Sequence, residues 1–585
     1  MNEIEVAADK LGIEPGYYDV FGHWHAVSPE TLRRLMTALA GAQAAPAPPG
    51  VDAAPVRAFQ GDGRRVWGLA VQLYALRSCR NWGHGDFGDL NRLMTLAAAR
   101  GASAVGLNPL HALFPDRAGQ ASPYAPNSRL FLNVLYIDVA AIPEFPGVEA
   151  AGLAGDIAAA RAAALIDYPA VAGAKLAGLR AAYAAFDSAA APARRADFEA
   201  YRAEQGDGLL RLACFEVLRM RHAPLPWPQW PEPWRQPDSA TLLGLRADHR
   251  AECEFQEFMQ WVAARQLQAC KDESHRLGMS IGLYTDLAVG IDPHGADAWS
   301  RQDAVLAGLS IGAPPDEFNT GGQDWGLAPF NPHTLAINDF EPLRQLMRAA
   351  MSHAGAVRMD HVLGLNRMYL IPRGLSAREG AYVRYPFEAV LRVIAEESNR
   401  ARCIVIGEDL GTVPDGFRET MARWGLWTYR VMLFEREHDG RFRQPETYPA
   451  EALATFNTHD LPTFRGWFIG DDLATRHTIG IDPGETEEAR AHARETLRWI
   501  LTERAPSYAP DDIAAVAAVL AQTPSRLVTV GLDDILDVVE QINIPGTVDE
   551  HPNWRRKLPV DVEDLGSHPG LQRVAQAFAE NGRGQ

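Results

Sequence analysis

The chain has 585 residues, of which 47% are hydrophobic and 22% are charged, and its formal net charge is −18 at pH 7. This is the composition of a globular protein large enough for more than one ordinary domain. The negative charge argues against a nucleic-acid or anionic-membrane surface, because either would require clustered Lys and Arg. The five cysteines are scattered, with neither disulfide-framework nor zinc spacing, and no apolar run has the length of a signal segment or a membrane span. The sequence therefore predicts a cytoplasmic protein without a membrane partner.

The first 64 residues differ in character from the rest of the chain. Residues 1–42 are predicted to form a small helical lead-in, because Ser28-Pro-Glu-Thr31 precedes an amphipathic run that ends near Leu39. Residues 43–64 are predicted to be a linker, since their first part is rich in Pro and Ala. We expect a catalytic body over residues 65–585.

From Arg65 onward, apolar runs of strand length alternate with helical segments. This alternation predicts an α/β fold, a (β/α)₈ TIM barrel with parallel strands. Helical insertions are expected between the second and third strands, at about 140–250, and between the seventh and eighth strands, at about 470–520. The eight predicted strands are 67–74, 104–109, 280–286, 357–360, 404–408, 429–434, 452–457 and 525–531.

Four carboxylates follow or end these runs: Asp286, Asp360, Glu408 and Asp460. In a (β/α)₈ barrel the C-terminal strand ends meet at one face, and catalytic groups lie there. We therefore expect these acids to lie together at the barrel mouth.

Retaining glycoside cleavage requires two carboxylates about 5 Å apart, one as nucleophile and one as general acid/base. Two of the four acids have neighbours that suit these roles. Arg358 and Asp360 are two residues apart, so they lie on the same face of a strand, and the guanidinium favours an ionised Asp360. Glu408 follows an apolar run, and desolvation there should raise its pKa and retain a proton. Asp460 could stabilise an oxocarbenium-like transition state, with His459 as a hydrogen-bond donor.

Several aromatic and histidine side chains could have a functional role or could be purely structural. Tyr124 and Trp325 are candidate sugar platforms, although single aromatics more often serve packing. Three tryptophans in a Pro-rich run are predicted to be structural, and a His-x-His pair before the barrel is predicted to be a surface pair. These residues are Trp227, Trp230 and Trp234, and His23 and His25.

Nine motifs occur in order along the chain, at 81–90, 122–124, 312–318, 322–326, 358–361, 407–411, 458–463, 543–547 and 553–558. With them the chain resembles an amylomaltase, in the 4-alpha-glucanotransferase (disproportionating enzyme) family of the α-amylase-type clan. The likeness runs from about Trp67 almost to the C-terminus. Only about sixty residues precede the barrel, fewer than in relatives with the same form of the 458–463 motif.

The resemblance implies transfer of α-1,4-glucan segments from a donor maltodextrin to the 4-hydroxyl of glucose, maltose or another maltodextrin, by retaining double displacement. It implies that Asp360 is the nucleophile, Glu408 the acid/base and Asp460 the transition-state stabiliser. It implies no cofactor and no metal, and it makes no prediction of oligomeric state. The implied sugar-binding residues are Tyr124, Asp286, Arg358 and His459 around the scissile bond, and Gln323 and Trp325 on a loop over the acceptor subsites.

Other functions remain open at this point. An α-1,4-glucan hydrolase would use the same carboxylates, because water could replace the acceptor. A catalytically inactive glycan-binding barrel is disfavoured because the three catalytic acids are all present. A metal-dependent amidohydrolase barrel is disfavoured because the first strand lacks a His-x-His motif.

Overall fold

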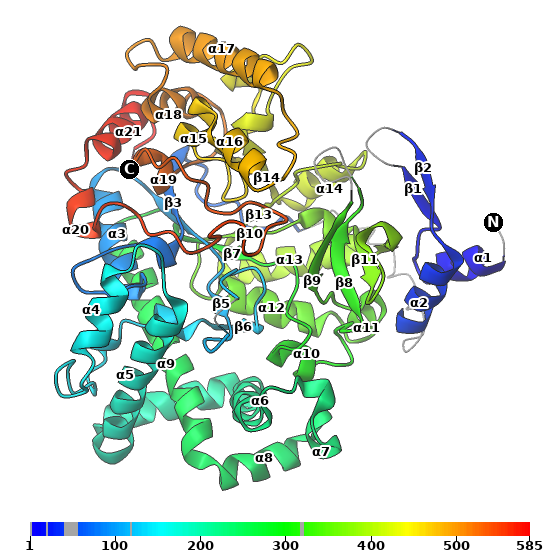
Figure 1. The fold of residues 1–585 in the computed structure, drawn as a ribbon, viewed down its shortest axis with the longest axis vertical. Coiled ribbons are helices and arrows are strands. Elements are labelled where there is room, and N and C mark those ends of the chain that lie inside the picture. The colour runs from blue at the N-terminus through cyan, green and yellow to red at the C-terminus, as the bar shows by residue number, and fades with distance from the viewer. Residues whose placement is uncertain (1–2, 19–21, 40–55, 118–119, 316–320, 585) are drawn as a thin grey trace.

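Eight parallel strands close into a barrel at the centre of the protein, in which each strand pairs with its neighbours in chain order and the last strand pairs with the first (Figure 1). The computed structural model describes residues 3–18, 22–39, 56–117, 120–315 and 321–584. All eight predicted runs are strands of this barrel, so the predicted fold class is confirmed. The strands are β3 (Val66–Val71), β4 (Ala104–Leu107), β7 (Gly282–Leu287), β10 (Ala356–Met359), β13 (Ile404–Gly407), β14 (Trp427–Val431), β15 (Ala452–Thr455) and β16 (Leu527–Gly531).

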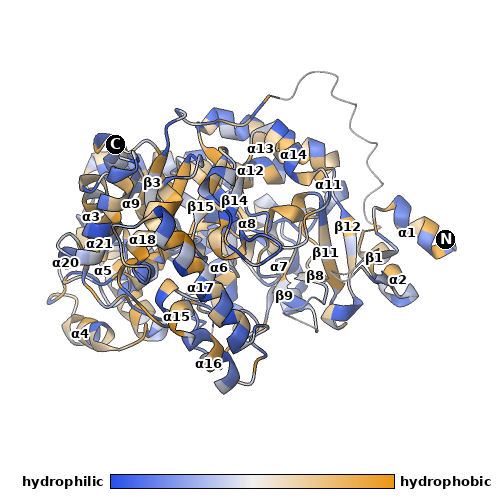
Figure 2. Cartoon of the chain, turned by 90° about the horizontal axis from the view of Figure 1, so that it is seen from above, coloured by the Kyte–Doolittle hydropathy of each residue, from blue (hydrophilic) through white to orange (hydrophobic). Residues whose placement is uncertain are grey.

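Helices surround the barrel and bury its outer face. Among them, α3 (Phe87–Ala99) begins at Asp86, whose side chain accepts hydrogen bonds from the backbone N–H groups of Gly88 and Asp89. Every residue of α18 (Ile513–Ala521) is buried, because this helix packs between β16 and a C-terminal helix. In Figure 2 apolar residues are concentrated on the strands in the middle of the molecule, and hydrophilic residues lie on the outward sides of the helices. The other surrounding helices are α9 (Arg250–Arg276), α12 (Glu341–Met351), α13 (Phe387–Ala401), α14 (Phe417–Trp424) and α21 (Pro569–Glu580).

The span predicted as the first helical insertion holds a group of helices that lies beside the barrel (Figure 1). Trp227 and Trp230 are buried in its core, as expected of structural residues, and Trp234 packs against the same cluster. Its helices are α4 (Ala154–Ala162), α5 (Tyr168–Ala189), α6 (Pro192–His222), α7 (Glu232–Arg235) and α8 (Ser239–Asp248).

The span predicted as the second insertion lies between β15 and β16. It contains α16 (Asp471–Thr478) and α17 (Glu487–Arg504), followed by α18, and α15 (Phe464–Ile469) comes just before it.

A four-stranded antiparallel sheet, in the order β12-β11-β8-β9, was not predicted. It is built from the segments that follow β7 and β10 in the chain. Its central pair joins strands about 60 residues apart, and a local hydrophobic pattern cannot reveal such a pairing. A short hairpin of β5 (His111–Ala112) and β6 (Ser128–Leu132) was also missed. The sheet strands are β8 (Leu309–Ala313), β9 (Gln323–Leu327), β11 (Arg367–Pro372) and β12 (Ala381–Arg384).

The N-terminal region is only partly helical. Between α1 (Glu3–Lys10) and α2 (Pro29–Leu39) lies an unpredicted hairpin of β1 (Gly16–Tyr18) and β2 (Trp24–Ala26). Buried residues of both helices share one apolar cluster with β8, β11 and β12. The N-terminal region therefore covers the antiparallel sheet.

The predicted linker and the predicted surface histidine pair also lie in the N-terminal region. Most of the predicted linker, residues 43–55, lies outside the described residues, and residues 56–64 pack on the barrel, where the Phe59 N–H donates to Ser398 Oγ at 2.9 Å. His25 is exposed on β2 and stacks on Tyr17 with ring centroids 5.4 Å apart. Across the described ranges, no helix is both long enough and apolar enough to cross a bilayer.

After β16 and α19 (Leu532–Ile535) the chain passes over the barrel mouth before it reaches α20 (Val562–Leu565) and α21 (Figure 1). We call residues 541–558 the crossing segment.

Candidate active site

A single guanidinium lies between two carboxylates at the C-terminal ends of β7 and β10. Arg358 and Asp286 are register partners on these strands, and Arg358 Nη1 lies 2.8 and 2.7 Å from the two oxygens of Asp286. Arg358 Nη2 lies 3.0 Å from Asp360 Oδ1. The same-face placement expected from their spacing is therefore confirmed, because Arg358 and Asp360 both point into the barrel mouth.

The protonation of Asp360 differs from the sequence-based expectation. Arg358 was expected to hold its pKa low, but burial raises the pKa of Asp360 to about 6, and Arg358 offsets only part of this rise. Arg358 also binds Asp286, whose negative charge itself raises the pKa of Asp360. The side chain of Asp360 keeps 21% of its surface exposed. At neutral pH the ionised form of Asp360 still predominates.

Glu408 lies on the strand next to Asp360. β10 and β13 pair with Met359 opposite Gly407, so Asp360 and Glu408 are the next residues on neighbouring strands, whose spacing is about 4.8 Å. The His361 N–H donates to Glu408 Oε2 at 2.9 Å. Burial raises the pKa of Glu408 to about 8, in the direction expected from its apolar strand. This order of pKa values places the proton on Glu408 and the negative charge on Asp360 near pH 7.

His459 and Asp460 form an ion pair in the loop after β15. His459 Nε2 lies 3.3 Å from Asp460 Oδ2, and Asn543 Nδ2 donates to Asp460 Oδ1 at 2.6 Å. Burial acts to raise the pKa of Asp460, but His459 and Asn543 outweigh it and the pKa lies below its usual value. Burial likewise acts to lower the pKa of His459, and Asp460 reverses the sign. The pKa of each partner is thus shifted in the direction that favours its charged form, and 46% of the Asp460 side chain is exposed.

Tyr124 connects the two acidic groups. Its hydroxyl donates to Asp286 Oδ2 at 2.6 Å, and its ring stacks on His459 with centroids 4.8 Å apart and an interplanar angle of 27°. Burial and Asp286 raise its pKa well above the usual value, so the hydroxyl remains a donor. Tyr124 comes from the loop between β5 and β6, far from both partners in sequence.

Trp325 and Gln323 lie on strand β9, whereas a loop was predicted. Trp325 Nε1 donates to Gln323 Oε1 at 3.2 Å, and its ring meets His361 edge-on with centroids 5.2 Å apart. The antiparallel sheet therefore brings Trp325 against the residue that follows Asp360.

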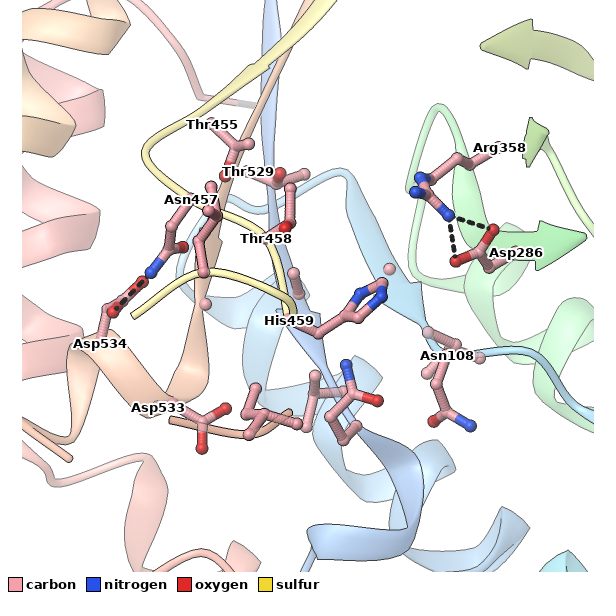
Figure 3. Close-up of a pocket in the computed structure, with 18 of the residues that line it drawn as sticks. Asn108, Asp286, Arg358, Thr455, Asn457, Thr458, His459, Thr529, Asp533 and Asp534 are labelled. Atoms are coloured by element: carbon pink, nitrogen blue, oxygen red, sulfur yellow. Dashed lines mark hydrogen bonds and ion pairs between the residues drawn. The ribbon is translucent and has the colours of Figure 1, made fainter. Parts of the chain in front are cut away.

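A cavity of about 90 Å³ extends into the barrel beside His459. In Figure 3 the ring of His459 lies on the side of the cavity toward Arg358, and Asn457 bonded to Asp534 lies on the opposite side. Burial raises the pKa of Asp534 to about 7. Sequence reasoning singled out neither residue. Polar lining residues include Asn108, Asp286, Arg358, Asn457, His459 and Asp534.

Three further residues beside the site were given no role from the sequence. Asn543 and Trp554 lie in quoted motifs, but their neighbours Asp460 and Tyr124 are distant in the chain. Asp409 is fully buried behind Glu408 and accepts from Thr428 Oγ1 at 2.6 Å. The motifs in the sequence could have drawn attention to these residues, but their contacts with the site could not be inferred from the sequence.

In the described part of the chain, the candidate site included, no group of three or more His, Cys, Asp or Glu side chains is arranged to hold a metal ion.

Comparison with known proteins was made on sequence and on structure. Residues 71–562 match the 4-alpha-glucanotransferase family. The chain is 38% identical to the 4-alpha-glucanotransferase of Mycobacterium tuberculosis over 547 residues, which are 88% of this chain and 75% of that protein. It is 35% identical to the 4-alpha-glucanotransferase of Haemophilus influenzae over 555 residues, 88% of this chain and 79% of that protein.

Solved structures agree with this assignment. The amylomaltase of Corynebacterium glutamicum superimposes with a TM-score of 0.84 at 28% identity, covering 98% of this chain and 99% of that one. The amylomaltase of Streptococcus agalactiae, solved in complex with acarbose, shares the fold with a TM-score of 0.73 at 19% identity, over 89% of this chain and 100% of that one. With a family match over most of its length and relatives above 30% identity, the chain belongs to the 4-alpha-glucanotransferase family.

Proposed function

We propose that this 4-alpha-glucanotransferase works by retaining double displacement, with Asp360 as nucleophile and Glu408 as general acid/base. The observation that carries the proposal is the position of these acids at neighbouring places on β10 and β13, one strand spacing apart. Acids that follow adjacent strand ends can approach to the roughly 5–5.5 Å of a retaining pair, whereas an inverting pair must stand farther apart to hold a water between its carboxyl groups.

In the first step Asp360 attacks the anomeric carbon of the donor glucan. A bond forms between its carboxylate oxygen and that carbon, while the bond to the leaving-group oxygen breaks. Glu408 gives its proton to the leaving oxygen, and the raised pKa keeps that proton in place until the donor binds.

In the second step the acceptor displaces Asp360. Glu408, now ionised, takes the proton of the acceptor 4-hydroxyl, whose oxygen bonds to the anomeric carbon as Asp360 leaves. Two inversions retain the α configuration.

The remaining charged groups act on the sugar at the scissile bond. We assign Asp460 to stabilisation of the developing positive charge, because His459 and Asn543 keep it ionised. Arg358, Asp286 and Tyr124 form one bonded set that fixes Asp360 and offers hydrogen bonds to sugar hydroxyls.

The substrates we propose are maltodextrins as donors, with glucose, maltose or maltodextrin as acceptors. Gln323 and Trp325 are assigned to the acceptor side, because Trp325 contacts His361 beside the nucleophile. A sugar held there is delivered in reactive geometry, an advantage that bulk water lacks. The cytoplasmic location stays a prediction.

Maltotriose tests the proposal against hydrolysis. Transfer yields glucose and a ladder of longer maltodextrins, while the total number of reducing ends stays nearly constant. Chromatography by length, together with a reducing-end assay, measures both quantities. New reducing ends that appear in step with donor consumption would identify a hydrolase and refute the transferase mechanism.

A further inference from the structure

The crossing segment holds the loop that carries His459 and Asp460. Gln541 Nε2 donates to the backbone carbonyl of Asp460 at 2.9 Å, and the Asn543 N–H donates to the carbonyl of His459 at 3.2 Å. With the side-chain bond from Asn543 to Asp460, the segment binds both backbone and side chain of this loop. In Figure 1 the segment runs across the front of the barrel strands.

Trp554, also in the crossing segment, has an unusual backbone. Its φ is +60°, a left-handed conformation that bulky side chains rarely adopt, and its side chain is only 6% exposed. Such a conformation persists only where surrounding contacts impose it, and it is often found at functional sites.

The indole ring of Trp554 packs against two site residues. Its centroid lies 5.5 Å from the ring of Tyr124 and 5.3 Å from the ring of His459, and these two rings stack on each other. Tyr124 binds Asp286, and His459 binds Asp460. The indole of Trp554 therefore packs against the two side chains that bind these acids.

Contacts from the helical insertion hold Trp554 in place. The Tyr168 hydroxyl, in the first turn of α5, donates to the carbonyl of Trp554 at 2.7 Å. Two further bonds follow in the crossing segment: the Ile166 N–H donates to the Arg555 carbonyl at 2.7 Å, and Lys557 Nζ donates to the Ala160 carbonyl at 2.8 Å. The crossing segment is thus bound to the insertion along several residues.

We propose that Trp554 is a positioning residue, which sets the orientation of Tyr124 and His459 and is itself held by Tyr168 of the insertion. The inference rests on the proposed roles of Asp360, Glu408 and Asp460. The ring contacts of Trp554 in the site are with Tyr124 and His459, which in turn bind Asp286 and Asp460. Its effect passes through two rings, so its loss should act on the chemical step more than on substrate affinity.

The experiment compares four variants with the wild-type protein: Trp554→Ala, Trp554→Phe, Tyr168→Phe and Trp499→Ala. Trp499 is 48% exposed on α17, so its variant controls for the loss of any indole. We expect Trp554→Ala to lower kcat roughly 10²-fold with little change in KM, since a displacement of about 1 Å costs that much. Trp554→Phe should recover most of the rate, Tyr168→Phe should show a smaller loss, and Trp499→Ala should match the wild type.

The double variant separates positioning from general destabilisation. If Tyr168 acts through Trp554, then Tyr168→Phe should cost nothing further in kcat when added to Trp554→Ala. Rates are expressed per folded enzyme, counted by circular dichroism and by labelling with a fluorinated donor. A wild-type kcat in folded Trp554→Ala overturns the inference, and so do losses confined to thermal stability or independent losses in the double variant.

Two further outcomes are assigned in advance. If Trp554→Ala does not fold, the kcat of Tyr168→Phe becomes the test of the inference. A wild-type kcat in Tyr168→Phe then overturns it. If Asp360→Asn retains turnover, the proposed function fails whatever Trp554 does. If Asp360→Asn is inactive and the Trp554 and Tyr168 variants have wild-type kcat, only the inference about Trp554 fails.

Discussion

Arg358 illustrates how one guanidinium can bind two carboxylates at once. Its guanidinium binds Asp286 through one nitrogen and Asp360 through the other. Burial raises the pKa of Asp360 to about 6, and Arg358, which also binds Asp286, offsets only part of this rise. The proposed nucleophile is therefore ionised at neutral pH, while the pKa of Glu408, at about 8, leaves the proposed acid protonated.

Asp360→Asn should remove nearly all turnover, because the amide is a poor nucleophile and forms no glycosyl ester. The fold and glucan binding should remain, since Asn keeps the volume of the side chain. Turnover of maltotriose and mass spectrometry after incubation with a fluorinated donor measure the effect. A glycosyl adduct on a different carboxylate in the wild-type protein would show that Asp360 is not the nucleophile.

The pKa values predict a bell-shaped pH dependence. Activity should rise as Asp360 ionises near pH 6 and fall as Glu408 loses its proton near pH 8, both midpoints belonging to the coupled pair. Glu408→Gln should lower turnover of maltodextrins by about 10²–10⁴-fold. With an activated glucosyl donor the loss in the glycosylation step should be small, and the alkaline limb of that step should be absent. Equal losses on both donors would assign Glu408 a structural role.

The same pKa shift predicts a stability effect. Burial disfavours the ionised form of Glu408. The free-energy cost of ionising Glu408 in the folded protein is therefore absent below its ordinary pKa of 4.5 and complete above about 8. Relative to Glu408→Gln, the wild type should lose free energy of unfolding as the pH rises, by up to roughly 1.4 kcal/mol per pH unit. Urea unfolding at pH 5 and pH 8.5 measures the difference. The exposed Glu503→Gln is the control, and a pH-independent difference would contradict the assigned burial cost.

At the scale of elements, strand register places Asp360 beside Glu408, and a separate sheet carries Gln323 and Trp325, the residues proposed for the acceptor side. β10 and β13 bring Asp360 beside Glu408 through main-chain pairing alone. β9 belongs to the antiparallel sheet, whose strands follow β7 and β10 in the chain. The spacing between Asp360 and Trp325 therefore depends on how the antiparallel sheet packs on the barrel, which sequence changes can alter without disturbing the barrel itself.

Trp325→Ala should raise the hydrolytic share of the reaction. The variant removes an aromatic face beside His361 and leaves the acids intact, so the intermediate still forms but water competes better with the acceptor. The ratio of new reducing ends to transferred glucose, measured with maltotriose, reports the effect. Trp24, 53% exposed on the N-terminal hairpin, provides a matched Trp24→Ala control. An unchanged ratio in Trp325→Ala would remove Trp325 from the acceptor side.

At the scale of the whole molecule, the C-terminal part of the chain closes the barrel at both ends. The crossing segment covers the mouth, and Arg583 lies at the opposite end, fully buried. Its Nη1 donates to the carbonyl of Val66, the first residue of β3, and its Nη2 to the carbonyl of Thr523 ahead of β16, at 3.0 and 2.6 Å. Arg583 thus joins the first and last strands where the barrel closes.

Arg583→Met should destabilise the fold by about 2–4 kcal/mol, because it leaves several buried carbonyl groups without donors. Thermal and urea unfolding measure the loss. Arg573→Met is the control, since Arg573 forms a surface pair with Asp512 and such pairs contribute at most about 1 kcal/mol. Equal losses in the two variants would show that the Arg583 bonds do not stabilise the closure.

The sequence alone determined the barrel and the position of its acids. Each barrel strand is an apolar run of local character, and a carboxylate directly after such a run lies at the mouth because all parallel strands end on one face. The shared face of Arg358 and Asp360 followed from the two-residue period of a strand. The direction of the Glu408 pKa followed from its apolar neighbours.

Only the tertiary structure decided the features that depend on distant segments. The pairing of β8 with β11, the bond from Asn543 to Asp460 and the packing of Trp554 against Tyr124 join residues dozens to hundreds of positions apart. The pKa of Asp360 was expected to fall because only Arg358 was visible from the sequence. Burial and the second charge of Asp286 reversed it. Secondary-structure propensity depends on residues that are neighbours in the sequence. Burial and contacts with distant side chains arise only when the chain has folded.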